Sequence, residues 1–168
     1  MSRCLIAISL AFTLAAGACL PAMLGAQTAH RPAASGQYVP VKVCSLLSVA
    51  EVKKLAPWAR QLDQFATAEE KAIGTLGSSC NYPTADVQVL SWRKETIDAA
   101  RKVRPLETVT GVDDEAWLSN NRDEYAELYA RVGRHLLTVQ YIIPTGQTFA
   151  SAKPTAIALA KAFAARLN

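Results

Sequence analysis

The chain has 168 residues, a length that fits a single domain able to bury a core without a stabilising metal. Its 18 basic and 14 acidic residues give a net charge of +4, which is too small to indicate nucleic acid as a partner.

The first 26 residues have the parts of a secretory signal peptide: an early positive charge, an apolar run over 5–20, and small residues before Gln27. The run is shorter than the roughly 20 residues of a membrane span, and no second run of that length follows. We therefore expect cleavage after Ala26 and a periplasmic or secreted protein without a membrane span. The alternative is a lipobox that would anchor the protein through a lipid on Cys19.

Residues 27–41 mix Ala, Pro, Ser and Gly without an apolar period, which predicts a flexible tether before a single domain over 42–168. Two of the four cysteines belong to the leader, so the exported domain would keep Cys44 and Cys80. An even pair in an oxidising compartment predicts a disulfide. A redox role is the alternative, but the pair lacks Cys-x-x-Cys spacing and nothing beside Cys44 would lower its pKa.

A first helix is predicted to begin after Ser48. The Ser48 hydroxyl can cap the first turn, and Glu51 three residues later can reach back to the Ser48 amide, which is a capping box. Leu47 and Val52 flank this box at the positions where two apolar side chains close over the first turn. The helix should end near Ala56 because a proline follows.

The next stretch, residues 58–77, is polar and irregular, with 66–72 as its one candidate for a short helical turn. A short strand is predicted around Cys80, followed by a turn at 83–85 and a β-rich strand over 87–92. This hairpin would be joined to the first helix by the disulfide.

Residues 95–104 are mostly helix formers and are followed by a proline, which predicts a second helix. Residues 106–109 are expected to form a strand. The clearest pattern is 125–132, where apolar and polar residues alternate as in a strand with one buried face. A hairpin turn at Gly133-Arg134 leads to an alternating strand over 136–143. Trp117 and Leu118 would pair with the other side of 125–132, across Asn120-Asn121. These three strands would form the centre of the sheet.

A last helix is predicted to begin between Thr148 and Pro154, with Pro154 in its first turn, where the missing amide costs nothing. Its apolar residues fall on one stripe: Ala156, Leu159, Ala160, Phe163 and Leu167. The expected fold is one α+β domain. It has an antiparallel sheet of about four or five strands, the first and last helices packed on one face, and a Cys44–Cys80 bridge.

Four segments together resemble a known class of proteins: Cys-Ser-Leu-Leu at 44–47 before a capped helix, a second cysteine ahead of a hairpin, residues 111–116 before a strand, and an Ala-rich terminal helix. The chain is similar over residues 41–168 to small secreted or lipoprotein α+β domains of unknown function, commonest in actinobacteria. The resemblance implies an exported domain with a disulfide and no assigned catalytic residues.

Two groups of residues are candidates for chemical sites. The acidic residues 113–115 could offer oxygen ligands to calcium, but they lack the alternating ligands of an EF-hand, so we expect a solvated or salt-bridged turn and no metal.

His135 is the histidine of the domain proper, and a hairpin end is where a surface residue is expected. A hydrolase-like enzyme using His135 with a nearby acid is the alternative function, although Ser79, Ser91 and Ser119 lack the motif of an activated serine. No cofactor is indicated.

A basic and aromatic group of residues is the better candidate for a binding surface. It comprises Trp92, Arg93, Lys94, Arg101, Lys102 and Arg104, joined by Tyr125 and Tyr129 on the sheet. Such a patch suits an envelope protein or an anionic surface. The alternative is a solvated helix face paired with Glu95 and Asp98, with the second helix covering the tyrosines. The expected function is an exported, non-enzymatic binding or accessory domain of the cell envelope.

Overall fold

Seven antiparallel strands form one sheet in a computed structural model that describes residues 40–57 and 67–168. They are β1 (Glu69–Ile73), β2 (Gly77–Tyr82), β3 (Ala85–Ser91), β4 (Glu107–Val109), β5 (Glu115–Asn121), β6 (Tyr125–Val132) and β7 (His135–Ile142). The helical elements of the described residues are η1 (Val43–Ser45), α1 (Val49–Leu55), α2 (Lys94–Val103) and α3 (Phe149–Leu167). The α+β class is confirmed, but the sheet is larger than the four or five strands expected.

The predicted leader, Cys19 and nearly all of the predicted tether lie outside the described residues. No helix of the described ranges is both long enough and apolar enough to cross a membrane.

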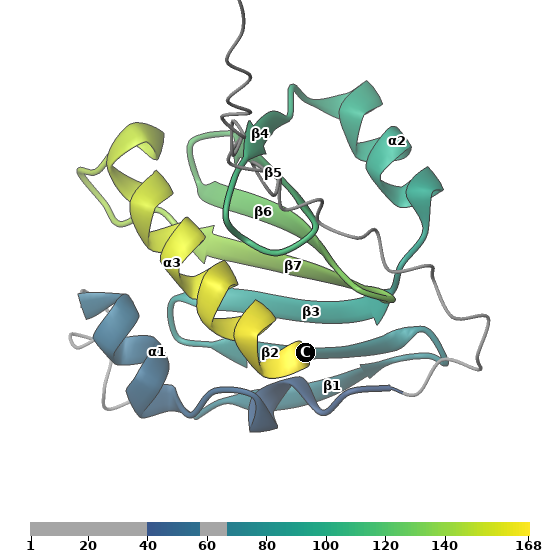
Figure 1. Cartoon of the computed structure of the whole chain (residues 1–168). Helices are drawn as coiled ribbons and strands as arrows, with labels where there is room; N and C mark the ends of the chain where they lie inside the picture. Colours follow the sequence, from purple (N-terminus) through teal and green to yellow (C-terminus); the bar gives the residue numbers. More distant parts are fainter. Residues whose placement is uncertain (1–39, 58–66) are drawn as a thin grey trace, which may run out of the picture.

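Two meanders make up the sheet, whose strand order is β1-β2-β3-β7-β6-β5-β4 (Figure 1). The pairing of β3 with β7 joins them. The β6–β7 turn lies at Gly133-Arg134 as predicted. By contrast, β5 continues through Asn121, so its turn to β6 is formed by residues 122–124 rather than by Asn120-Asn121.

The prediction of a helical turn over 66–72 is wrong, because residues 69–73 are the edge strand β1. Glu, Lys and Ala favour a helix locally. Here the chain instead pairs with β2 along its whole length, from Glu69 opposite Asn81 to Ile73 opposite Gly77. Strand pairing therefore overrides local propensity in this segment.

The main core lies between one face of the sheet and the helices α1 and α3, which lie side by side on that face (Figure 1). Val52 of α1 and Phe163 of α3 are both buried in it, and the Phe163 ring contacts Tyr82 of β2 with ring centroids 5.7 Å apart. The sheet contributes the alternate residues of its strands, among them Val87, Val89, Ala126, Leu128, Leu137 and Val139. The predicted α3 stripe is buried from Ala156 to Phe163, and Leu167 packs at its margin.

Helix α3 begins after Thr148, whose hydroxyl accepts a hydrogen bond from the Ser151 amide in a capping box. Pro154 lies five positions after Phe149, so it is inside the helix and not in its first turn as expected. A residue at this position normally donates its amide to the carbonyl four residues earlier, which here is Ala150. The helix therefore continues past one missing bond.

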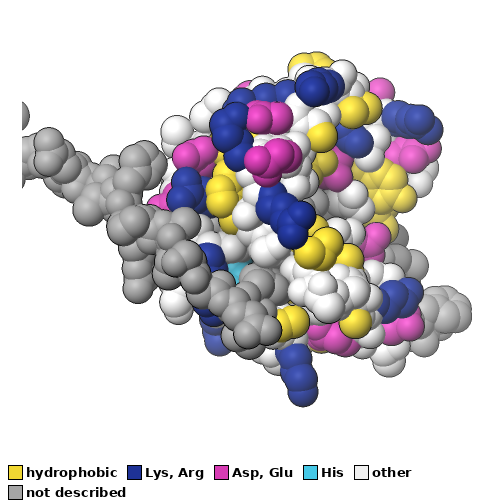
Figure 2. All heavy atoms as spheres, turned by 90° about the vertical axis from the view of Figure 1, so that its right-hand side faces the viewer, with side chains coloured by type: hydrophobic (Ala, Val, Ile, Leu, Met, Phe, Trp, Pro, Cys, Tyr) yellow, Lys and Arg dark blue, Asp and Glu magenta, His cyan; other side chains and the backbone are white. Residues whose placement is uncertain are grey.

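The opposite face of the sheet carries α2 over a second, smaller core of Ile97, Trp117, Tyr129 and Leu136. Strand β6 is thus buried on both faces, whereas its alternation predicted one. The side of the molecule seen in Figure 2 has basic and acidic side chains interspersed over its upper part, with hydrophobic ones between them.

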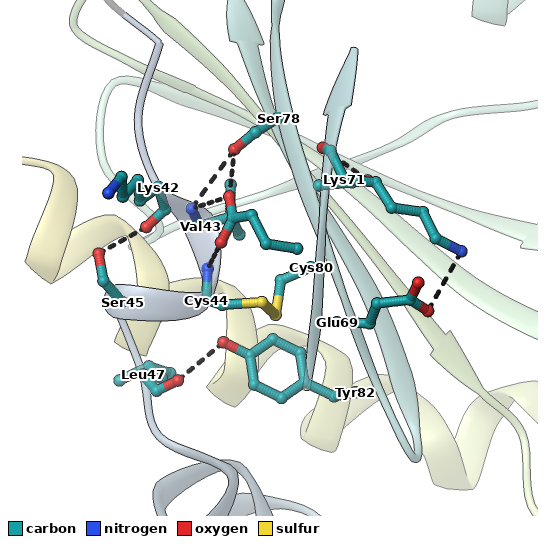
Figure 3. The surroundings of a disulfide bond; sticks show 12 residues. Lys42, Val43, Cys44, Ser45, Leu47, Glu69, Lys71, Ser78, Cys80 and Tyr82 are labelled. Carbon is teal, nitrogen blue, oxygen red and sulfur yellow. Dashed lines mark hydrogen bonds and ion pairs between the residues drawn. A yellow bond between two sulfur atoms is a disulfide. The ribbon is translucent and has the colours of Figure 1, made fainter. Parts of the chain in front are cut away.

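The predicted disulfide between Cys44 and Cys80 is present, and it ties η1 to β2 across 36 residues (Figure 3). Disulfides of this kind are typical of proteins outside the cytoplasm. A carboxylate strengthens the tie: Glu70 of β1 accepts hydrogen bonds from the Val43 amide at 2.8 Å and the Cys44 amide at 2.7 Å. It also accepts one from the Ser78 hydroxyl at 2.7 Å.

Candidate functional site

Helix α2 presents the predicted basic residues. It begins at Lys94 and ends at Val103 because Pro105 pushes the preceding residue out of the helical region, and Arg104 is extended. Lys94 and Arg101 each approach Asp98, with the Arg101 pair at 3.9 Å. These bonds hold the Asp98 carboxyl pKa below its usual range, with the hydrogen bond from Lys94 as the main cause. The alternative of a salt-bridged helix face is thus correct for these two side chains.

Arg101 also belongs to a stack of four side chains drawn from four elements or their ends. The indoles of Trp92 and Trp117 lie nearly parallel, 10° apart, with ring centroids separated by 6.2 Å. The Arg101 guanidinium carbon is 5.3 Å from the Trp117 ring, and that of Arg131 is 5.4 Å from the Trp92 ring. We call Arg101, Trp117, Trp92 and Arg131 the indole–guanidinium stack. Both cations gain from the electron-rich ring faces, and Arg131 is also 3.6 Å from Glu115.

A small cavity of about 150 Å³ opens beside this stack. Its lining residues are Trp92, Lys94, Ile97, Asp98, Arg101, Glu115 and Trp117. A larger hollow of about 410 Å³ continues from it along the β4–β5 loop and shares Glu115 and Trp117. Two indoles line this concave surface, helix α2 contributes Lys94, Arg101 and the acidic Asp98, and the β4–β5 loop and the start of β5 contribute further carboxylates.

The structure brings only part of the predicted surface to this cavity. Trp92, Lys94 and Arg101 line it. Arg93, immediately before α2, and Lys102, on α2, are exposed and lie outside it. Tyr125 lies at the start of β6.

Tyr129 is not a surface residue, because α2 covers it and leaves it 8% exposed. Burial, followed by the nearby Glu127 carboxylate, raises the pKa of the Tyr129 hydroxyl. The alternative, in which the second helix covers the sheet tyrosines, is therefore correct for Tyr129.

Arg104 turns away from the stack toward a buried carboxylate that sequence reasoning missed. Glu127 of β6 is 4% exposed and forms an ion pair with Arg104. Its other oxygen accepts a hydrogen bond from the Gln140 side-chain amide at 2.7 Å. The signal was available in the alternation of β6, which places Glu127 on the same face as Tyr129 and Arg131.

The prediction that His135 lies at the surface is wrong. The side chain is 9% exposed, and burial, followed by the charge of Arg134, lowers the pKa of its imidazole. Ser91 stands opposite it in the β3–β7 pair, yet neither residue lines the two cavities described above. A hydrolase needs an accessible base beside an acid and a hydroxyl, whereas His135 is largely buried.

The acidic turn is held by its own hydrogen bonds. Asp113 accepts one from the Asn168 side chain at 3.2 Å, Asp114 accepts one from the Gly133 amide at 3.3 Å, and Glu115 faces Arg131. The three carboxylates therefore have separate partners. In the described part of the chain, no group of three or more His, Cys, Asp or Glu residues is placed to hold a metal ion.

Comparison of the chain with family models, with curated proteins and with solved structures finds no match.

Proposed function

We propose that the protein is an exported, non-enzymatic binding or accessory domain of the cell envelope, and that it binds a protein partner through the cavity beside the indole–guanidinium stack. Export is supported by the signal-like leader and by the Cys44–Cys80 bridge. The indole–guanidinium stack is the observation that supports this binding surface.

The stack favours recognition because its cations are already oriented. A guanidinium on an indole face has fewer rotamers to lose when it binds, and its N–H donors point in fixed directions. Arginine and tryptophan are also the residues that most often dominate the binding energy of interfaces. Arg101 is half-exposed, so its outer donors are available to a partner.

The charges around the cavity favour a protein over a uniformly anionic surface. Lys94 and Arg101 of α2 line the cavity together with Asp98 of the same helix and Glu115 of β5, so it carries both signs of charge. A polyanion would meet these carboxylates and be repelled, whereas a protein can match both signs.

The experiment compares capture from envelope fractions by the immobilised protein and by Arg101→Ala. The variant should lose most of the captured partner, because the stacked guanidinium is removed while its helix is kept. Arg166→Ala is the matched control: it removes an arginine of similar exposure from α3 on the opposite face, where the side chain pairs with Glu51. Capture should be unchanged in the control.

Equal capture by Arg101→Ala and the parent protein would contradict the proposed surface. Anionic vesicles provide a second arm. If the parent and both variants bind vesicles alike and salt abolishes that binding, the partner is an anionic surface instead.

A further inference from the structure

A separate cleft of about 480 Å³ lies between the C-terminal end of α2 and the β5–β6 turn. Its lining residues are Val103, Arg104, Asn120, Asn121, Arg122 and Glu124. It shares no lining residue with the cavity beside the indole–guanidinium stack. Two arginines from different elements meet in it, one after the helix and one in the turn.

The Arg104 guanidinium is held in place by its ion pair with the buried Glu127 carboxylate. That carboxylate is itself held by Gln140, so the ion pair has a defined direction. The Arg104 side chain remains 26% exposed. A guanidinium carries five N–H donors in one plane, and an anchor on one edge leaves the others directed outward. Arg104 is thus built as a rigid donor at the cleft.

Arg122 occupies a backbone conformation that favours glycine. Its φ is +56°, and that of the next residue, Asp123, is +59°. Asp123 tolerates this region better, and the Asn120 side chain bonds both its amide and its carboxylate. Within residues 40–57 and 67–168, the exposed side chain of Arg122 has no hydrogen-bond or ion-pair partner. Local stability therefore does not explain an arginine at this position, and strained positions of this kind cluster at functional sites.

The chemistry of the lining indicates the ligand class. Two guanidiniums and the Asn121 amide offer donors on the lining, where Glu124 is the carboxylate; the Asn120 amide already bonds Asp123, and Glu127 pairs with Arg104. Carboxylate and phosphate oxygens are the groups that arginine forks bind best. Val103 is 75% exposed at the rim and would contact the carbon skeleton of such a ligand.

We infer that this cleft is a binding site for an organic anion, with Arg104 and Arg122 holding the oxygens of a carboxylate or phosphate group. The inference is independent of the proposed function, because neither arginine belongs to the stack.

The test is an NMR titration of the exported protein with inorganic phosphate and, separately, with sodium glucuronate at constant ionic strength. Saturable shifts are expected at the amides of residues 120–124 and at the Arg104 side chain. Tighter binding of glucuronate would identify a carboxylated source, and tighter binding of phosphate a phosphorylated one.

Arg122→Gly separates binding from folding. Glycine accepts the positive φ, so the melting temperature should rise, while affinity should fall about tenfold or more, as expected for the loss of one charge-assisted hydrogen bond. Arg104→Lys keeps a cation opposite Glu127 but loses the planar fork, and it should also weaken binding. Arg134→Ala is the control, since it removes an arginine from the β6–β7 turn, outside the cleft.

Three outcomes would overturn the inference: no saturable shift at residues 120–124 with either anion, unchanged affinity in Arg122→Gly, or equal losses in Arg122→Gly and Arg134→Ala. None of them affects the envelope-capture experiment, which depends on Arg101.

Discussion

The hydroxyl of Ser48 accepts a hydrogen bond from the Glu51 amide at 3.3 Å, and the Glu51 carboxylate accepts one from the Ser48 amide at 2.8 Å. The hydrogen bond from the Ser48 amide, followed by one that the Ser48 hydroxyl donates to the same carboxylate, holds the pKa of the Glu51 carboxyl below its usual value. Ser48→Ala leaves an amide of the first turn without its cap and should lower the free energy of unfolding by about 1 kcal/mol. Ser48→Asn should restore it, since asparagine caps as well as serine. Urea denaturation of the three proteins is the measurement, and equal midpoints for parent and Ser48→Ala would contradict the role of the cap.

His135 gives a pH-dependent prediction. Its pKa in the folded protein is below the value of 6.5 that it regains on unfolding, because burial disfavours the charged imidazole. Between these two values the unfolded chain binds more protons, so stability is complete above about pH 6.5 and falls as the pH decreases toward the folded pKa.

The measurement for His135 is the melting temperature between about pH 7.5 and pH 5 for the parent and for His135→Gln. The parent should lose stability across this range, and the variant should lose less. A profile of the same slope in both proteins would show that other groups cause the acid sensitivity.

For single residues, the sequence predicts those interactions that join residues close together in the chain. The capping box needs only Ser48 and Glu51, three residues apart, and both bonds form. The burial of His135 and Tyr129 depends on segments distant in sequence, and no local pattern reports it. The sequence indicates only half of the indole–guanidinium stack for the same reason. Trp92 and Arg101 belong to the predicted binding surface, whereas Trp117 and Arg131 join the stack only through the pairing of β5 with β6.

Strand β1 holds η1 mainly through one side chain. Glu70 accepts hydrogen bonds from the amides of Val43 and Cys44 and from the Ser78 hydroxyl, while its neighbour Glu69 forms an exposed ion pair with Lys71 at 3.4 Å. Glu70→Gln replaces one accepting oxygen with a donor and leaves an amide of η1 without a partner, so it should cost about 1–3 kcal/mol. Glu69→Gln is the control and should change stability by less than about 0.5 kcal/mol.

Chemical denaturation of both variants checks this prediction. A larger loss in Glu69→Gln than in Glu70→Gln would mean that β1 contributes through its surface charges rather than through its hold on η1.

The elements that the sequence misplaced are those whose local preferences disagree with their tertiary contacts. Residues 69–73 favour a helix, but β2 presents an edge to which they pair. Pro154 suggested a helix start, yet the capping box of Thr148 and Ser151 sets the start earlier. Helix α2 was found because its helix formers and the following Pro105 agree.

The disulfide is the covalent constraint on the whole molecule. It closes a loop with a sequence separation of 36, which should contribute roughly 3 to 4 kcal/mol through the entropy of the unfolded chain. The Cys44→Ala/Cys80→Ala protein should unfold at correspondingly lower urea concentration. The parent, unfolded without reductant, should contain no reactive thiol from this pair, and two titratable thiols would contradict the bridge.

For the whole molecule, the sequence predicts the class of the fold better than the number of strands and the second core. Alternation in β6 and β7 and the stripe of α3 were sufficient for an α+β domain with one main core. The sequence predicts the second core under α2 only as the alternative in which this helix covers the sheet tyrosines, because Ile97 and Leu136 are single apolar residues on otherwise polar or mixed faces. Long-range packing, not local pattern, decides that layer.

The junction of β3 with β7 has a consequence for the order of folding. Each meander is built from hairpins between neighbouring segments, but Val87 must find Val139, which is far along the chain. Contacts between distant residues cost more chain entropy before they form, so they slow folding. We expect this junction to be the rate-limiting step, with Val139→Ala slowing refolding and Val52→Ala in α1 mainly accelerating unfolding. Stopped-flow kinetics of these two variants checks this, and an equal slowing of refolding in both would contradict a rate-limiting junction.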